Sequence, residues 1–353
     1  DFVNFKMPTQ SRIVFLDALR AFAILMMLQG HWMSGLLNVN QLDTTHWGYR
    51  FWLYCRGFTA PAFFTLTGWV FCFLLLKNPL RGTQNPRIKK GLKRGAELLI
   101  WGYLLRLNLP SLLYGNINPS FFQPDVLHII GLSLFIIILI YSSLHFLKER
   151  LGWIFLLFGI GIFMLEPLYS SWNLDFLPPG ISGYLVKGYG GIFYLFPWLG
   201  YVFWGCAIAY FFKNRYSNYQ KWGIAFMAVG LALIFHSSSF FQFLGSSFQI
   251  SLFQKIASNN FLFIRFGDVL VLLALFMFFQ AQIKAKLWRF IGAHTLELYI
   301  VHYFILYGSI TGYGVYKFYS KELLLWESIL TLLFFLGACI GIVFVWRRKN
   351  HHP

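Results

Sequence analysis

Long apolar runs separated by short polar segments fill almost the whole of this sequence. About ten runs of 18 or more residues are broken by proline, glycine, asparagine or clusters of charge, and a helix of about 20 apolar residues crosses a bilayer. We therefore predict an all-α, polytopic integral membrane protein. Its spans are expected near residues 13–36, 51–76, 95–114, 125–147, 152–170, 190–212, 222–244, 259–281, 290–311 and 323–346.

Composition supports a membrane protein and excludes a large soluble domain. Of the 353 residues, 58% are hydrophobic and only 12% are charged, whereas soluble globular proteins carry about 25% charged residues. No polar stretch is long enough to fold as a separate soluble domain. We expect one transmembrane domain over residues 1–353, held in a lipid bilayer.

The basic residues are distributed in a way that predicts orientation. The formal net charge of +17 would attract nucleic acid if it were gathered on one exposed face. Instead, 20 of the 29 Lys and Arg lie at the two termini and in the loops on their side, against five in the opposite loops. By the positive-inside rule both termini are cytoplasmic, and no nucleic-acid partner is expected.

Ionisable side chains inside the predicted spans indicate a polar cavity between the helices, because hydrocarbon penalises each of them by a few kcal/mol. The first span holds Asp17, Arg20 and His31. Arg20 and His31 are eleven residues apart, so on a helix they point in nearly the same direction, roughly 16 Å apart along the axis. The predicted topology places Arg20 toward the cytoplasm and His31 toward the outside. Other such groups are Arg56, Glu97, Arg106, Asp125, His128, Glu166, Arg265, Asp268, His294, Glu297 and His302.

Spacing predicts partners for some of these groups. Asp17 with Arg20, and Arg265 with Asp268, are three residues apart and can form ion pairs on one helix face. Asp125 and His128, also three apart, are either a carboxylate that orients a general base or a purely structural pair. By contrast, Glu297 and His302 are five residues apart and are expected to serve different neighbours.

The segment from Lys77 to Arg94 has seven basic residues and no acidic one. We interpret it as a cytoplasmic loop that signals topology and attracts lipid. Alternatively, it is a landing surface for a polyanionic cytosolic substrate such as a nucleotide-bearing cofactor. The four cysteines show no CxxC or Cys/His ligand spacing, so no metal site is expected.

Several of these segments resemble the transmembrane acyltransferases. LDALRAFAILMMLQGH (residues 16–31) is similar to their opening motif, in which an Arg precedes a His by eleven positions, and GFTAPAFFTLTGWVF (57–71) is similar to their second-span pattern. LELYIVHYFIL (296–306) resembles the Tyr and His pattern of their penultimate spans. DVLHIIGLSL (125–134) and FPWLGYVFWGCAIAY (196–210) look more like the branch that contains heparan-alpha-glucosaminide N-acetyltransferase and its bacterial relatives.

The resemblance implies acyl transfer from cytosolic acyl-CoA, most often acetyl-CoA, to a hydroxyl or amine of an extracytoplasmic glycan or glycolipid. It also implies a bacterial inner membrane as the location. The donor nucleotide would rest against Lys89, Lys90, Lys93 and Arg94, with Arg20 and its neighbour Asp17 deeper in the membrane. We expect no metal.

Acyl transfer needs a base, and three histidines are candidates. His31 is the first choice, and it stands where the glucosaminide branch tends to carry Asn. The rivals are His128, with Asp125 as its orienting carboxylate, and His46, the counterpart of that branch's outer-loop His. The alternative from another functional class is a secondary transporter or flippase that uses the buried charged residues as a relay.

Overall fold

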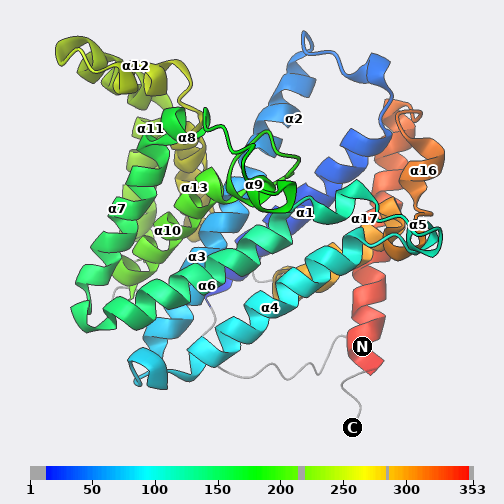
Figure 1. The fold of residues 1–353 in the computed structure, drawn as a ribbon, viewed down its shortest axis with the longest axis horizontal. Coiled ribbons are helices and arrows are strands. Elements are labelled where there is room, and N and C mark those ends of the chain that lie inside the picture. Colours follow the sequence, from blue (N-terminus) through cyan, green and yellow to red (C-terminus); the bar gives the residue numbers. More distant parts are fainter. Residues whose placement is uncertain (1–12, 214–218, 284–285, 350–353) are drawn as a thin grey trace.

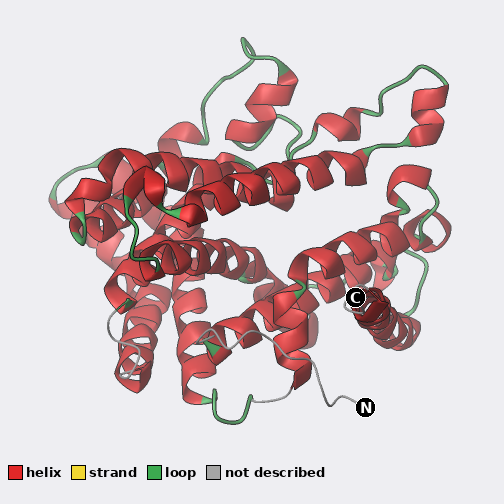
Figure 2. Cartoon of the chain, turned by 90° about the horizontal axis from the view of Figure 1, so that it is seen from below, coloured by secondary structure: helices red, strands yellow, loops and turns green. Residues whose placement is uncertain are grey.

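The computed structural model describes residues 13–213, 219–283 and 286–349, and within these ranges every regular element is a helix (Figure 2). The prediction of an all-α membrane protein is confirmed. Four basic residues counted on the cytoplasmic side, Lys6, Arg12, Arg215 and Lys284, lie outside the described residues.

Within the described ranges, seven segments are long and apolar enough to cross a membrane. They are α1 (Val14–Leu36), α2 (Trp47–Gly57) with α3 (Thr59–Lys77), the segment Pro119–Leu147 around α6 (Val126–Leu144), α10 (Leu195–Phe212), α11 (Tyr219–Ser247), α13 (Phe261–Phe278) and α17 (Leu325–Lys349). α14 (Lys286–Ala293) and α15 (Thr295–Tyr307) meet at a bend of 75°. Taken together, they make an eighth span. The count of ten spans and the cytoplasmic termini stay predictions.

The other two predicted spans are also helical, but one of them is displaced along the chain. α7 (Arg150–Met164) covers most of the predicted 152–170 but ends about six residues before it, whereas α4 (Pro86–Arg106) begins and ends about eight residues before the predicted 95–114. Asn85 caps α4 by accepting a hydrogen bond from the Arg87 N–H (3.0 Å), and Pro86 suits the first helical turn. Residues 86–94, which we predicted as part of a loop, therefore form the charged first half of a long helix.

The remaining helices are short and connect the long ones. They are α5 (Leu109–Leu113), α8 (Glu166–Tyr169), α9 (Pro179–Leu185), α12 (Ser251–Ser258) and α16 (Val315–Tyr319), with 3-10 turns at Val39–Gln41, Gly82–Gln84, Pro119–Phe122, His145–Leu147 and Ser309–Thr311.

Glycine allows the central helices to approach closely. α3 packs along α10, where a Cβ at Gly68 would overlap the backbone of Val202, and a Cβ at Gly205 would overlap the backbone of Thr65. Any side chain at either position would force the two helices apart. α4 and α6 lie side by side across the front of the molecule (Figure 1).

α1 contacts α3, α13, α14, α15 and α17. Near the C-terminal end of α1, the Trp32 ring stacks on Phe335 of α17, with 4.4 Å between the ring centroids. Helix α1 is therefore held on several sides, and the groups on its remaining face have defined positions.

Candidate active site

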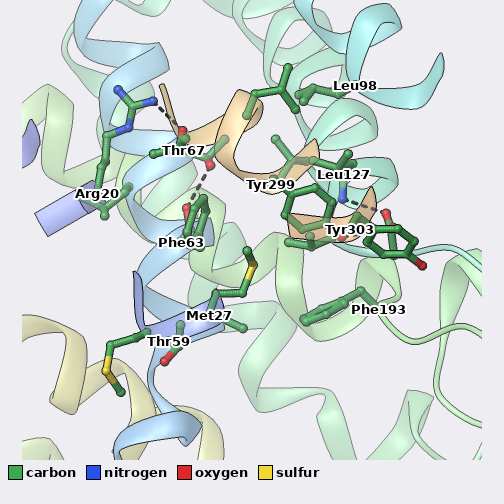
Figure 3. Close-up of a pocket in the computed structure, with 18 of the residues that line it drawn as sticks. Arg20, Met27, Thr59, Phe63, Thr67, Leu98, Leu127, Phe193, Tyr299 and Tyr303 are labelled. Carbon is green, nitrogen blue, oxygen red and sulfur yellow. Dashed lines mark hydrogen bonds between the residues drawn. The ribbon is translucent and has the colours of Figure 1, made fainter. Parts of the chain in front are cut away.

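A cavity of about 600 Å³ lies between α1, α3, α4, α6 and α15. Figure 3 shows its lining: Arg20 and Met27 come from α1, Thr59, Phe63 and Thr67 from α3, Leu98 from α4, Leu127 from α6, and Tyr299 and Tyr303 from α15. Both Arg20 and His31 line it, as their helical spacing predicts. The cavity thus follows one face of α1 for about three turns.

The Arg20 end of the cavity is cationic. The guanidinium of Arg20 donates to the Thr295 hydroxyl (3.2 Å) and lies 3.9 Å from the Asp17 carboxylate, so the predicted ion pair is present. Arg94 of α4 also lines the cavity and pairs with Glu97 at 3.0 Å. Two arginines from helices far apart in the sequence therefore line the same cavity.

The three lysines predicted to act with Arg94 lie outside the cavity wall. Lys89, Lys90 and Lys93 are on the first half of α4 and are absent from the lining residues. They are exposed and share α4 with Arg94, so they form a basic surface outside the cavity. A long polyanion bound at Arg94 would pass over this surface.

At the other end, His31 pairs with a second histidine. Nδ1 of His31 and Nε2 of His302 are 3.1 Å apart, although the two residues are 271 positions apart in the chain. Arg56 lies beside them: a Cβ at Gly30 would be 3.2 Å from Arg56 Nε, and the guanidinium stacks over Trp52 at 5.0 Å. This end of the cavity therefore presents an imidazole and a guanidinium group to a bound ligand.

A buried network surrounds Asp125, on the cavity wall. Its carboxylate lies 2.9 Å from His128 Nδ1 and 3.6 Å from Arg106 Nε, and it accepts a hydrogen bond from the Tyr299 hydroxyl at 3.3 Å. Only 4% of the Asp125 side chain and 4% of the Arg106 side chain are exposed. The same carboxylate caps α6 by accepting from the Leu127 N–H at 3.0 Å.

His128, one rival base, lies behind this network. It is fully buried, does not line the cavity, and completes a capping box with Asp125 at the start of α6. Its ring fills the space left by Gly102, where a Cβ would be 2.5 Å from His128 Cε1. The Asp125–His128 pair exists as predicted, and its position suits the structural role better than direct contact with a substrate.

His46, the other rival, caps α2 from an exposed position. Its Nδ1 accepts a hydrogen bond from the Gly48 N–H at 3.3 Å. It is also absent from the cavity lining. Of the three candidate bases, His31 alone lines the cavity.

Two further predictions about pairs are confirmed. Arg265 and Asp268 form an ion pair at 3.0 Å, and Asp268 also accepts from the Tyr54 hydroxyl. Glu297 pairs with Arg347 of α17 whereas His302 pairs with His31, so Glu297 and His302 do serve different neighbours.

A tyrosine pair packs against the buried ring of His128. The hydroxyls of Tyr103 and Tyr184 are 2.7 Å apart, and the Tyr103 ring meets His128 edge-on at 4.4 Å. Burial raises the pKa of Tyr184, which lies on the connecting helix α9, so its hydroxyl stays protonated. Among the described residues, no group of three or more His, Cys, Asp or Glu is placed to hold a metal ion.

Several lining residues have no role that the sequence predicts. From the sequence, Arg56 and Arg106 are only ionisable groups inside spans. Tyr299, Tyr303 and Tyr307 recur every four residues, so they fall on one helical face and line the cavity together. That spacing was a signal available in the sequence.

The chain matches the model of a known protein family. The family model described as "Heparan-alpha-glucosaminide N-acetyltransferase, catalytic" matches residues 12–236, well over half of the chain. The matched range includes His31, Arg56, Arg94, Arg106 and Asp125, whereas α15 with His302 lies beyond it. None of the curated proteins compared with the chain matches it.

Proposed function

Because the chain belongs to the family of the heparan-alpha-glucosaminide N-acetyltransferase catalytic domain, we propose that it takes an acetyl group from acetyl-CoA and passes it to an extracytoplasmic glycan or glycolipid. Membership makes it a membrane acetyltransferase of a glycan-modifying type. One observation supports the finer proposal: one cavity runs along α1 and is lined by Arg20 toward one end of the helix and by His31 toward the other.

The donor would enter at the arginines. Arg20 and Arg94 present guanidinium groups, which bind phosphate oxygens in a planar, bidentate fashion. Lys89, Lys90 and Lys93 lie outside the mouth, where the nucleotide part of acetyl-CoA would remain. The narrow pantetheine arm would then carry the thioester along the apolar stretch formed by Met27, Phe63 and Leu98 and by their neighbours.

The chemistry would take place beside His31. As general base, His31 takes the proton from the acceptor hydroxyl or amine while the acceptor oxygen or nitrogen attacks the thioester carbonyl carbon. The carbonyl oxygen becomes an oxyanion, and Arg56, which lies against Gly30 and lines the cavity, would stabilise it. The intermediate collapses with loss of the CoA thiolate, which receives the proton from His31.

Donor binding is tested first, without any acceptor. Acetyl-CoA should raise the unfolding temperature of the detergent-solubilised protein, because a ligand that binds only the folded state stabilises it, while acetate should not. No shift at millimolar acetyl-CoA would refute this donor. A transporter or flippase for another solute predicts no shift.

The base is tested by His31→Gln, with His236→Gln as the matched control because His236 is exposed on α11 and does not line the cavity. Transfer of labelled acetyl to a glucosamine-terminated oligosaccharide should fall by about 10²-fold or more in His31→Gln. Stabilisation by acetyl-CoA should persist. Undiminished transfer by the purified His31→Gln protein would exclude His31 as the base, and an acetyl group trapped on His31 without acceptor would show a covalent intermediate instead of direct transfer.

A further inference from the structure

We propose that Arg56 selects acceptors that carry an acidic group, a carboxylate or a phosphate, close to the hydroxyl or amine that receives the acetyl group. The proposal names the acceptor class of the cavity and therefore rests on the proposed function. Recognition of the acceptor and stabilisation of the oxyanion are separate contributions of one guanidinium, which has five N–H donors. They affect the kinetics differently, so each can be measured.

Arg56 differs from the other arginines of the cavity. Among the described residues, the arginines that line it are Arg20, Arg56, Arg94 and Arg106. Three of them have a carboxylate partner at 3.0 to 3.9 Å: Arg20 with Asp17, Arg94 with Glu97 and Arg106 with Asp125. In the part of the chain that the structure describes, no carboxylate pairs with Arg56. A cation between membrane helices is costly without a partner, so a ligand can supply the missing negative charge.

Arg56 lies beside the proposed base. It belongs to the last turn of α2 and is half-buried. A Cβ at Gly30 would be 3.2 Å from Arg56 Nε, and Gly30 directly precedes His31 on α1. Arg20, where the donor phosphates are proposed to bind, is about three turns away along α1. A negative charge bound at Arg56 therefore belongs to the acceptor.

Two aromatic rings support the guanidinium of Arg56. Its Cζ lies 5.0 Å from the centre of the Trp52 ring, and that ring stacks on Tyr49 at 5.5 Å between centroids. The face of an aromatic ring attracts a cation but does not take up its N–H groups as a carboxylate does. These groups stay available for a second partner. Their planar fork matches two oxygens of a carboxylate or a phosphate.

Tyr303 and Tyr307 give the cavity a surface that suits a sugar ring. Both line the cavity, and their rings are 4.8 Å apart between centroids. The Tyr307 ring is 6.2 Å from that of His31. The hydroxyls of Tyr303 and Tyr307 form no hydrogen bond with another described residue. The ring faces can pack against the C–H groups of a sugar while the hydroxyls bond to its oxygens.

These groups together predict a preference among sugars. A sugar without a negative charge would pack on the tyrosines but leave the N–H groups of Arg56 to water. An acidic sugar forms charge-assisted hydrogen bonds with Arg56, which are about twice as strong as neutral ones. A site built around a polar contact discriminates against an analogue that lacks it.

The wild-type enzyme tests this preference with three probes. The first is a glucosamine-terminated disaccharide whose second sugar is glucuronic acid, and the second is its methyl ester, which lacks the negative charge. The third has a neutral second sugar that carries a phosphate. The kcat/KM of the carboxylate probe, the phosphate probe or both should exceed that of the ester by about tenfold or more, and the better of the two identifies the acidic group. Equal values for all three, or a preference for the ester, would overturn the proposal.

Arg56→Gln separates the two contributions of the guanidinium. Loss of the oxyanion contact should lower kcat for the acidic probe and the ester alike. Loss of the acidic contact should raise KM for the acidic probe alone, so the tenfold preference should disappear, while Arg56→Lys should keep part of it. The control is Arg50→Gln, because Arg50 is exposed on the same helix and does not line the cavity. A preference that persists in Arg56→Gln would exclude Arg56 as the selecting residue.

Binding without turnover distinguishes failure of this proposal from failure of the proposed function. The acidic probe should raise the unfolding temperature of the wild type more than the ester does, and the difference should vanish in Arg56→Gln. If the difference is found but no probe is acetylated, the proposed function fails and the anion site stands. If the acidic probe and the ester are acetylated equally well, the selectivity fails alone. The comparison of probes in the wild type needs no variant, so it decides the question even if Arg56→Gln does not fold.

Discussion

Replacing Asp125 with asparagine should destabilise the protein strongly through one uncompensated charge. The asparagine side chain has nearly the same shape and would still cap α6, since asparagine is as good an N-cap as aspartate. What the substitution removes is the carboxylate 3.6 Å from Arg106, whose side chain is only 4% exposed. Breaking a buried ion pair from one side costs about 3–5 kcal/mol because the remaining charge has no partner.

Equilibrium unfolding in mixed micelles of mild and denaturing detergent would measure this loss. The matched control is Glu149→Gln, because Glu149 is 67% exposed and pairs with Lys213 at 3.5 Å. An exposed pair of this kind is worth about 1 kcal/mol or less. Adding Arg106→Gln to Asp125→Asn should restore part of the stability by removing the orphaned charge. A free-energy loss in Asp125→Asn no larger than that in Glu149→Gln would refute the reasoning.

Three further outcomes are expected. Arg94→Gln should weaken acetyl-CoA binding about tenfold, or about 1.4 kcal/mol, and should make binding less sensitive to salt, as measured by thermal shift at several ionic strengths. Gly205→Leu should abolish folded protein on size-exclusion chromatography because it would force α3 from α10, whereas Gly337→Leu, at a position with nothing within 4 Å, should behave as wild type. Hydrogen bonds from Thr45 lower the pKa of Asp43 in the exposed loop before α2, so Thr45→Val should raise that pKa toward 3.8. The Asp43–Thr45 turn should then be lost at a higher pH as acid is added. An unchanged NMR titration of Asp43 would contradict this.

The helices could be predicted from the sequence because each has a local cause. Apolar runs long enough to span a bilayer recur along the chain, and each predicted run coincides with helix over most of its length. The error at α4 has a local cause as well. Its first half is so basic that hydropathy indicates a loop, while the Asn85 cap and Pro86 start a helix there. Charge obscured a capping signal that was present.

Breaks within spans were harder to foresee. The helix of the second span stops at Phe58 between α2 and α3, and the ninth bends by 75° at His294. Pro61 is a local signal for the first break, because proline has no N–H and its ring clashes with the carbonyl four residues earlier, that of Gly57. No proline lies near His294, so the second break has no such signal.

Some contacts of the candidate site can be predicted from the spacing of residues along one helix, and others cannot. The pairs Asp17–Arg20, Asp125–His128 and Arg265–Asp268 are three residues apart, so helical geometry alone predicts them. The contact between His31 and His302 joins residues 271 positions apart. It depends on how α1 packs against α15, which a single sequence does not encode in any local pattern.

Two of the helices that form the cavity are weakly apolar, and this affects the order in which the helices insert into the membrane. α4 begins with a run of lysines and arginines, and α14 and α15 reach the length of a span only as a bent pair. Such segments enter a bilayer poorly by themselves, whereas α1, α3 and α6 belong to segments that are apolar enough to insert as they leave the ribosome. The cavity would then close only after the other helices are in place to receive α4 and α15, and partly inserted chains would hold no acetyl donor.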